Sequence, residues 1–370
     1  MVKVLNIIGK RPTGGIGAFT YNYQSHINKN NKIQIDYLLF DDKQDGEFDR
    51  KVKAIGSKVY VLPALKNFRL FSIWKKIDLF MKYYGRHYDV LHLHSVNIAF
   101  KCFTSARKYG IKNLIAHSHA TVYSDKKLNA LRNKILCLNL KRLANHYLAC
   151  SKAAGEFLFG KESIEDVIVF NNAIECDKFR FLDNIREKIR KELGIEKSYV
   201  IGHVGRFCEQ KNHAFLIEIF EKCLEYMENA VLLLVGDGPL KENIERIVKK
   251  KGIQDRVKFL GIRNDVNYLL QAFDVLVLPS LFEGLPIIGI EAQASGLPLV
   301  VSDVITRELK ILDVEFISLK NDLSVWANKI INSNSQNREK AYVLVRKSGY
   351  DINVEANKLA DFYMKIANKG

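Results

Sequence analysis

The segment DVLVLPSLFEGLPIIGIEAQASGLP, residues 274–298, decides the fold of this chain. An apolar strand ends at Ser280, a tight loop holds Gly284 and Pro286, and a helical pattern begins near Ile287, with Pro286 suited to the first helical position. A strand that passes through a short loop into a helix is the repeating unit of a parallel sheet with crossover helices. The free N–H groups at such a helix start, with the helix dipole behind them, favour phosphate.

The same alternation of strands and helices extends over the chain and predicts an α/β fold. In the first half, β-rich runs are expected at Val4–Ile8, Ile33–Phe40, Lys58–Leu62, Val90–Leu93, Leu114–His117, Tyr147–Cys150 and Val167–Phe170. In the second half, they are expected at Tyr199–Val204, Val231–Val235, Val257–Leu260, Val275–Leu278 and Leu299–Val301, separated by helices such as Ala214–Met227 and Leu240–Lys250. We therefore expect two Rossmann-like, doubly wound sheets.

The length of 370 residues suits two domains of ordinary size. We place these domains at residues 1–180 and 181–351, with a linker near 175–185 in a polar stretch. The helix at about 352–370 is expected to pack back on the first domain. Ligands of open α/β sheets bind at the carboxyl ends of the strands, so an active site is expected in a cleft between the two sheets.

The composition excludes several classes of protein. With 48% hydrophobic residues and six prolines, the chain is neither collagen-like nor largely disordered. The six cysteines form no C-x-x-C pair and are interpreted as reduced core residues, not as disulfides or a zinc site. The N-terminus is unlike a signal peptide, and no run of about 18 apolar residues could span a membrane. We therefore expect a folded, cytoplasmic protein.

The net charge of +16 is concentrated in the first half of the chain. Residues 1–180 contain 30 Lys and Arg against 15 Asp and Glu, whereas residues 181–370 contain 27 against 26. A basic surface attracts the phosphates of nucleic acid or of anionic lipid. Two basic stretches, Lys66–Arg86 and Lys126–Arg142, have a helical, partly apolar pattern. Each is interpreted either as a helix on the inner face of the cell membrane or as a helix facing the core.

Four charged residues lie where strands of the second half end. Glu283 lies in the loop before the helix, and Glu291 lies one turn inside it, a spacing that suits the phosphates and ribose of a nucleotide sugar. Arg206 and Lys211 share the loop after the strand Tyr199–Val204, at the same edge of the sheet. The alternative is that the glutamates are partners of the helix dipole and the two cations are ordinary surface residues.

These motifs resemble those of glycosyltransferase family 4, whose members are retaining enzymes with the GT-B fold. Glu283 and Glu291 match the family's E-x7-E signature, and the stretch from Gly205 through Arg206 to Lys211 is similar to its G-R-x3-x-K-N/G motif. The resemblance implies that Glu283 contacts the donor sugar, Glu291 binds the ribose, and Arg206 and Lys211 neutralise the leaving diphosphate. It also implies backbone contacts, to the diphosphate from Gly284, Leu285 and Ile287, and to the base from Gly261 and Ile262.

The glycine-rich loop Gly14–Gly17 is similar to a family loop near the donor phosphates or the acceptor. It follows the first strand and opens a helix running toward Asn28. The resemblance implies contacts from Gly15 and Gly17, and a plain tight turn is the alternative. The third glycine of a dinucleotide-binding motif is missing, since Thr20 stands there, so NAD binding is disfavoured.

Two pairs of histidines follow strands of the first half. His117 aligns with the family histidine that contacts the donor sugar, and His119 is the second candidate. We expect the i,i+2 spacing to point these two rings to opposite sides of the strand, which disfavours a zinc site; packing is the other alternative. His92 and His94 have the same spacing and are interpreted as structural.

The resemblance implies a hexosyltransferase that moves a sugar from a UDP-sugar, or another nucleotide diphosphate sugar, to a lipid-linked or oligosaccharide acceptor. The stretch Ala149–Gly160 resembles the branch of the family that assembles capsular polysaccharide and exopolysaccharide. The sequence contains no D-x-D pair of the kind that holds Mg²⁺ on a diphosphate, so no metal or other cofactor is expected. The alternatives are a UDP-sugar epimerase of the same fold and a basic nucleic-acid-binding protein, although no nucleic-acid-binding module is recognised.

Overall fold

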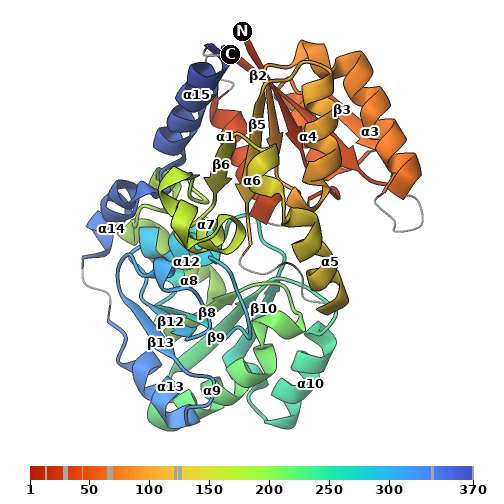
Figure 1. Cartoon of the computed structure of the whole chain (residues 1–370). Coiled ribbons are helices and arrows are strands. Elements are labelled where there is room, and N and C mark those ends of the chain that lie inside the picture. Colours follow the sequence, from red (N-terminus) through yellow and green to blue (C-terminus); the bar gives the residue numbers. More distant parts are fainter. Residues whose placement is uncertain are drawn as a thin grey trace. The chain divides into compact units, whose positions relative to one another are not determined.

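A computed structural model describes residues 1–12, 15–27, 32–43, 45–64, 70–120, 123, 127–334 and 337–368. The chain divides into two compact units (Figure 1). Unit 1 contains Met1–Ala173 together with Ile352–Gly370, and unit 2 contains Ile174–Asp351. The first crossing between the units therefore comes slightly before residue 180, the boundary expected from the sequence.

Unit 1 is built on a parallel sheet with the strand order β3-β2-β1-β4-β5-β6-β7. Its strands are β1 (Val2–Ile7), β2 (Ile33–Phe40), β3 (Val59–Leu62), β4 (Val90–Leu93), β5 (Asn113–Ser118), β6 (His146–Ala149) and β7 (Val167–Val169). Its helices are α1 (Gly15–Ile27), α2 (Glu47–Ala54), α3 (Leu70–Tyr84), α4 (Ala99–Lys108), α5 (Lys127–Cys137), α6 (Leu140–Leu143), α7 (Lys152–Phe159) and α15 (Ile352–Asn368).

Both faces of this sheet are apolar, because alternate strand residues enter two different cores. Leu5 and Ile7 of β1 pack with α3 and α4, whereas Val4 packs on the other face with α1 and α15. The helix α15 therefore completes unit 1, although it comes last in the chain. It lies against α1 and β1 (Figure 1).

Unit 2 contains a second parallel sheet, with the strand order β10-β9-β8-β11-β12-β13. Its strands are β8 (Tyr199–Val204), β9 (Ala230–Val235), β10 (Val257–Gly261), β11 (Val275–Leu278), β12 (Leu299–Ser302) and β13 (Val314–Ile317). Its helices are α8 (Asp183–Leu193), α9 (His213–Tyr226), α10 (Lys241–Lys250), α11 (Val266–Ala272), α12 (Ile287–Ala294), α13 (Leu323–Ile331) and α14 (Arg338–Val345). The strand β13 was not predicted from the sequence.

Two further expectations concern the cysteines and the membrane. All six cysteines carry free thiols, and five of them are buried. Within the residues that the structure describes, none of the helices has both the length and the apolar character needed to cross a membrane.

Candidate functional site

The carboxyl ends of β8 and β11 lie side by side in unit 2 and carry two loops that are fastened together. The first loop contains the short helical turn Glu209–Lys211, and the second runs from Pro279 to Pro286. The carbonyl of Gln210 accepts a hydrogen bond from Leu281 N–H at 2.8 Å, and the Gln210 amide donates to Phe282 O at 3.0 Å. These bonds hold the loop of Lys211 against the loop of Glu283.

Asn212 adds a third fastening between the same loops. Its backbone is left-handed, with φ of 55°, a conformation that asparagine tolerates better than most residues. Its side-chain amide donates to Pro279 O at 3.1 Å. The asparagine after Lys211 therefore positions the loop and starts α9 directly behind it.

The structure brings two of the predicted site residues into direct contact. Lys211 Nζ forms an ion pair with Glu283 Oε1, and Ser280 Oγ donates to the same oxygen at 3.0 Å. The Lys211 and Glu283 side chains are only 15% and 9% exposed, so their attraction is stronger than it would be in open water. Lys211 and Glu283 thus form a largely buried ion pair.

Close backbone packing explains the glycines beside this pair. A Cβ atom at Gly205 would lie 3.2 Å from both Cδ and Cε of Lys211, so Gly205 leaves room for the lysine stem. A Cβ at Gly236, which follows β9, would collide with Gly205 O, and one at Gly238 would lie 2.5 Å from Phe207 O. Gly236 and Gly238 therefore let the loop after β9 approach the loop after β8.

Arg206 lies in the same loop as Lys211 but has a different environment. Its side chain is exposed, and among the described residues it has neither an ion pair nor a side-chain hydrogen bond. The structure places Arg206 at the same edge of the sheet as Lys211 and Glu283 without bringing it into contact with them. This cation is therefore available to an anionic ligand.

The helix α12 begins at Ile287, directly after the loop of Glu283. Pro286 has φ of −71° and ψ of 115° and precedes the first helical residue, so its expected place inside the first turn is wrong by one position. The first N–H groups of a helix have no acceptor within the helix, which leaves those at Ile287 and Ile288 directed at the loop. A Cβ at Gly284 would meet nothing within 4 Å, so the space in front of α12 is open at this point.

Glu291 lies inside α12 and is partly buried. Burial raises the pKa of its carboxyl from 4.5 to about 7. The protein therefore holds this carboxyl in an environment that disfavours its charge. A ligand that donates hydrogen bonds to the carboxylate, such as a pair of ribose hydroxyls, would offset that cost.

The predicted base contacts lie at the end of β10, in the same sheet. Gly261 has φ of 65°, and its carbonyl accepts a hydrogen bond from Gly236 N–H at 2.8 Å. Ile262 is 78% exposed. These two residues therefore continue the edge formed by the loops after β8 and β9.

In unit 1, the glycine-rich loop leads into α1, which begins at Gly15; Gly14 lies outside the described residues. A Cβ at Gly17 would lie 3.0 Å from the Pro12 side chain. Gly17 thus allows the helix start to pack against the chain that leaves β1.

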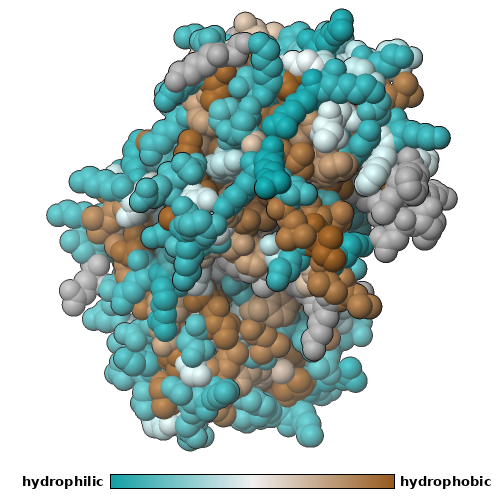
Figure 2. Space-filling view, in the orientation of Figure 1, coloured by the Kyte–Doolittle hydropathy of each residue, from teal (hydrophilic) through white to brown (hydrophobic). Residues whose placement is uncertain are grey.

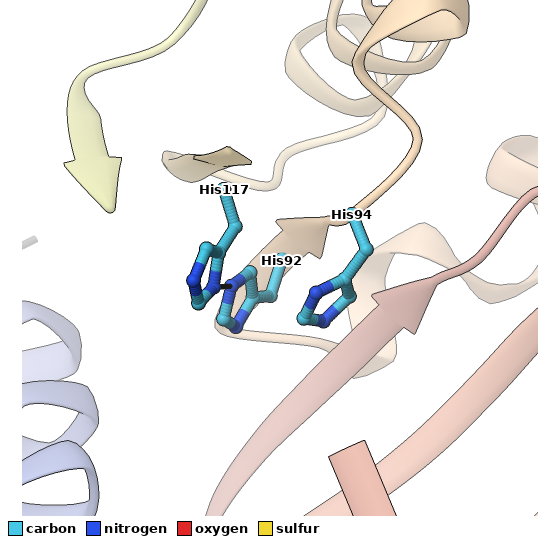
Figure 3. A group of neighbouring side chains, drawn as sticks. All are labelled: His92, His94 and His117. Atoms are coloured by element: carbon cyan, nitrogen blue, oxygen red, sulfur yellow. Dashed lines mark hydrogen bonds between the residues drawn. The ribbon is translucent and has the colours of Figure 1, made fainter. Parts of the chain in front are cut away.

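The histidines at the carboxyl ends of β4 and β5 form a compact block, and Figure 3 shows three of them, His92, His94 and His117. His92 and His94 stack with their ring centroids 4.2 Å apart, and His117 and His119 stack at 4.1 Å. The expectation that i,i+2 histidines point to opposite sides is wrong, because side chains alternate along a strand and residues two apart share a face. The block was missed as a unit for this reason.

Hydrogen bonds join the two stacks edge to edge. His92 Nε2 and His117 Nδ1 lie 2.9 Å apart, and His94 Nδ1 and His119 Nε2 lie 2.8 Å apart. Phe19 of α1 packs edge-on against His117, with centroids 4.9 Å apart. Desolvation by burial lowers the pKa of His92, His94 and His117 well below 6.5 and that of His119 to about 3. All four rings are therefore neutral at pH 7.

The block also supplies the closest approach to a metal-ligand set within the described residues. His92, His94 and His117 each offer a ring nitrogen, and these atoms lie within 4.8 Å of one another. Zinc–nitrogen bonds of about 2.0–2.1 Å in a tetrahedral site would bring the nitrogens to roughly 3.4 Å. Both nitrogens of His92 already take part in hydrogen bonds. As the rings stand, the block is a hydrogen-bonded network.

A pocket of about 210 Å³ opens beside this block within unit 1. It is lined by the three histidines His94, His117 and His119, and also by Ile16, Tyr123 and Asn133 among others. His117 Nε2 and His94 Nε2 are buried and have no hydrogen-bond partner among the described residues. The pocket is therefore lined by apolar side chains and histidine rings, and two of these rings each carry a buried nitrogen without a partner among the described residues.

Comparison with known proteins identifies the family. The model of "Glycosyltransferase Family 4" matches residues 13–178, and that of "Glycosyl transferases group 1" matches residues 185–314. The putative glycosyltransferase EpsF of Bacillus subtilis is 30% identical over 98% of this chain and 96% of its own length. A UDP-Gal:α-D-GlcNAc-diphosphoundecaprenol α-1,3-galactosyltransferase of Escherichia coli is 27% identical over 84% of this chain and 85% of its own length.

The solved structures agree with this assignment at the level of the fold. Anabaena Alr3699/HepE, crystallised with UDP, superposes with a TM-score of 0.78 over 99% of this chain and 100% of its own, at 18% identity. The two Rossmann-like units with their parallel sheets are those of the GT-B fold. The chain is therefore a glycosyltransferase and belongs to family 4.

Proposed function

We propose that this enzyme transfers a sugar, with retention of its anomeric configuration, from a UDP-sugar to a lipid-linked saccharide during the assembly of a capsular polysaccharide or exopolysaccharide. The observation that carries the donor half is the Lys211–Glu283 pair in front of the start of α12. The name of the Escherichia coli relative, which includes a UDP-sugar and a diphosphoundecaprenol acceptor, supports both halves.

In this proposal, unit 2 binds the donor through charges and backbone. The diphosphate lies in the open space at Gly284, where the N–H groups of Leu285 and Ile287 and the dipole of α12 face it. Lys211 and the exposed Arg206 supply positive charge, and Glu291 accepts hydrogen bonds from the ribose. Glu283, already paired with Lys211, accepts hydrogen bonds from hydroxyls of the donor sugar.

The reaction then proceeds without a metal ion. The bond from the anomeric carbon to the diphosphate oxygen breaks with oxocarbenium character, and Lys211 and Arg206 stabilise the charge that develops on UDP. The acceptor hydroxyl attacks the same face, and its proton passes to the departing phosphate oxygen. In unit 1, His117 contributes a hydrogen bond to a saccharide hydroxyl in its pocket.

The test begins with donor binding. Purified protein is heated in the presence of a panel of nucleotide sugars, and the true donor should raise the melting temperature by mass action. Transfer to an undecaprenyl-diphosphate-linked sugar is then measured with and without EDTA. Turnover that disappears with EDTA, or that persists when Arg206 and Lys211 are both changed to alanine, would contradict this proposal.

Contact with an anionic membrane is the second part of the proposal, and α5 is the surface that favours it. Four apolar side chains at helical spacing are strongly exposed: Leu128 (84%), Leu131 (60%), Ile135 (58%) and Leu138 (71%). Figure 2 shows hydrophobic atoms gathered where α5 lies in Figure 1. Cations lie on and directly after this helix, at Lys134, Lys141 and Arg142. Such a surface suits the interface of a membrane that contains anionic lipid.

The helix α3, within the other basic stretch, is different. Its apolar residues Ile73, Ile77, Phe80 and Met81 are buried in the core of unit 1, as in the core-facing alternative. Lys75 and Lys76 lie exposed on its outer side, and the stretch Lys66–Arg69 lies outside the described residues. Among the side chains that the structure describes, the outer side of α3 carries these lysines together with exposed Leu79 and Tyr83, so it offers mainly charge to a membrane.

Flotation with vesicles containing phosphatidylglycerol tests this surface. Leu131→Glu/Ile135→Glu should abolish flotation, and Lys75→Glu/Lys76→Glu should reduce it only in proportion to the charge removed. Vesicles of phosphatidylcholine alone measure the apolar part. Undiminished flotation of the α5 variant would exclude this helix as the membrane contact.

A further inference from the structure

A buried chain of hydrogen bonds connects the last helix of the protein to His117. Tyr363 of α15 lies 2.6 Å, through its hydroxyl oxygen, from His92 Nδ1, although the two residues are 271 positions apart. His92 Nε2 lies 2.9 Å from His117 Nδ1, and the two rings are nearly coplanar in orientation, with 6° between their planes. All three side chains are at most 1% exposed.

The direction of this chain follows from counting protons. A neutral imidazole carries one N–H group and one acceptor nitrogen. Because both nitrogens of His92 are engaged, one must donate and the other must accept. The chain therefore runs in one of two directions, and each direction fixes which nitrogen of His117 carries the proton.

The two directions differ in the groups that they leave unpaired. If the Tyr363 hydroxyl accepts, its own proton has no acceptor among the described residues, and His117 Nε2 is left as an unpaired lone pair. If the Tyr363 hydroxyl donates to His92 Nδ1, then His92 Nε2–H donates to His117 Nδ1, and the single unpaired group is His117 Nε2–H. The second arrangement leaves fewer buried polar groups unsatisfied, so it is favoured.

We infer that Tyr363 and His92 are positioning residues that hold His117 in the Nε2–H tautomer, so that the unpartnered nitrogen of His117 carries a hydrogen-bond donor. The ring nitrogen Nδ1 is occupied by His92, whereas Nε2 is buried in this structure, has no partner among the described residues and is the nitrogen left for a ligand of the pocket that His117 lines. A donor of this kind suits an oxygen atom of a saccharide and cannot act as a general base in this state. The identity of that ligand rests on the proposed function, whereas the tautomer does not.

The other pair of histidines provides an internal comparison. His94 and His119 are joined by a similar bond, but their chain does not reach Tyr363. Within the described residues, His94 Nε2 has no partner, so no neighbouring hydroxyl sets the direction there. The fixed tautomer is thus a property of the Tyr363–His92–His117 chain.

Nuclear magnetic resonance of protein labelled with ¹⁵N-histidine tests the inference without any substrate. Two-bond ¹H–¹⁵N spectra distinguish a protonated from an unprotonated ring nitrogen, and the signals lost in His117→Gln identify residue 117. Wild-type His117 should show a single neutral form protonated at Nε2. A spectrum showing His117 protonated at Nδ1, or at both nitrogens, would overturn the inference.

Tyr363→Phe then tests the cause. Removing the hydroxyl should convert His117 to a mixture of tautomers, whereas Tyr88→Phe, which removes another buried hydroxyl of unit 1 bonded to Asp36, should leave its spectrum unchanged. An unchanged His117 spectrum in Tyr363→Phe would refute a role for Tyr363. With equal tautomer populations, half of the molecules would present the donor, so the KM for the saccharide that His117 contacts should rise about twofold. A protein that shows the predicted spectra but no transfer would contradict the proposed function alone.

Discussion

Glu291 should make the protein less stable at neutral and alkaline pH than it would be with an uncharged residue. Burial raises the pKa of this carboxyl from 4.5 to about 7, so the folded protein keeps a proton that the unfolded chain releases. The free energy of unfolding therefore falls as the pH rises from about 4.5 to about 7, and the loss is complete above that range. At about 1.4 kcal/mol for each pH unit, the cost reaches about 3 kcal/mol.

Glu291→Gln keeps the shape of the side chain and removes the titration. We expect the variant to match the wild type near pH 4.5 and to be more stable at pH 8 by about 3 kcal/mol, which is roughly 6–12 °C in the melting temperature of a unit of this size. Calorimetric melting from pH 4.5 to pH 8 measures the difference. Glu218→Gln, at an exposed site on α9, is the matched control and should leave the pH dependence unchanged.

The same variant should bind UDP more weakly, because the glutamine oxygen is a weaker acceptor for ribose hydroxyls than a carboxylate. Stability and binding would then change in opposite directions. Parallel pH profiles for the wild type and Glu291→Gln would show that the site does not disfavour the charge, and the reasoning would fail.

Three further predictions concern the loops around this site. Lys211→Met should leave Glu283 buried without its partner and cost about 3 kcal/mol of stability, while Lys211→Met/Glu283→Gln should recover stability but not donor turnover. Calorimetry measures the stability and a UDP-release assay measures the turnover. Additive losses of stability would argue against a coupled pair. Arg206→Ala should change stability by less than about 0.5 kcal/mol because the side chain is exposed, yet should reduce turnover at least about tenfold; normal turnover would remove Arg206 from the site. Gly205→Ala should lower turnover by displacing the Lys211 stem. Gly284→Ala should keep the melting temperature and weaken UDP binding, as measured by titration calorimetry. Tight UDP binding by Gly284→Ala would show that the diphosphate does not bind beside Gly284.

Much of the fold could be predicted because buried parallel strands are short, continuous apolar runs and each is followed by a helical pattern. The segment 275–294 is an example, since its strand, loop and helix all occur where expected. The strand β13 was missed because its four residues include Glu315 and lie at an edge of the sheet, where one side needs no apolar partner. Local patterns carry little information about such edges.

The site was predictable where its residues belong to one loop or one motif. The ion pair between Lys211 and Glu283 was not predicted, because it depends on the adjacency of β8 and β11 and on the bonds of Gln210 and Asn212. The histidine block was missed for a different reason. The repeated H-x-H pattern at the ends of two strands would have predicted the block if residues two apart had been assigned to one face of the strand. Nothing in the local sequence of Tyr363 indicates that its hydroxyl reaches His92.

The packing of α15 on unit 1 has a consequence for how the protein folds during its synthesis on the ribosome. Domains usually fold as they emerge, the N-terminal one first. Here the sheet face that bears Val4, Val90 and Ile115 stays uncovered on one side until residues 352–368 have been made, after the whole of unit 2. Unit 2 can thus mature before unit 1 is finished. The nascent chain carries a half-built apolar face throughout, a natural target for chaperones and a reason why trimming the C-terminus should harm the opposite end of the sequence.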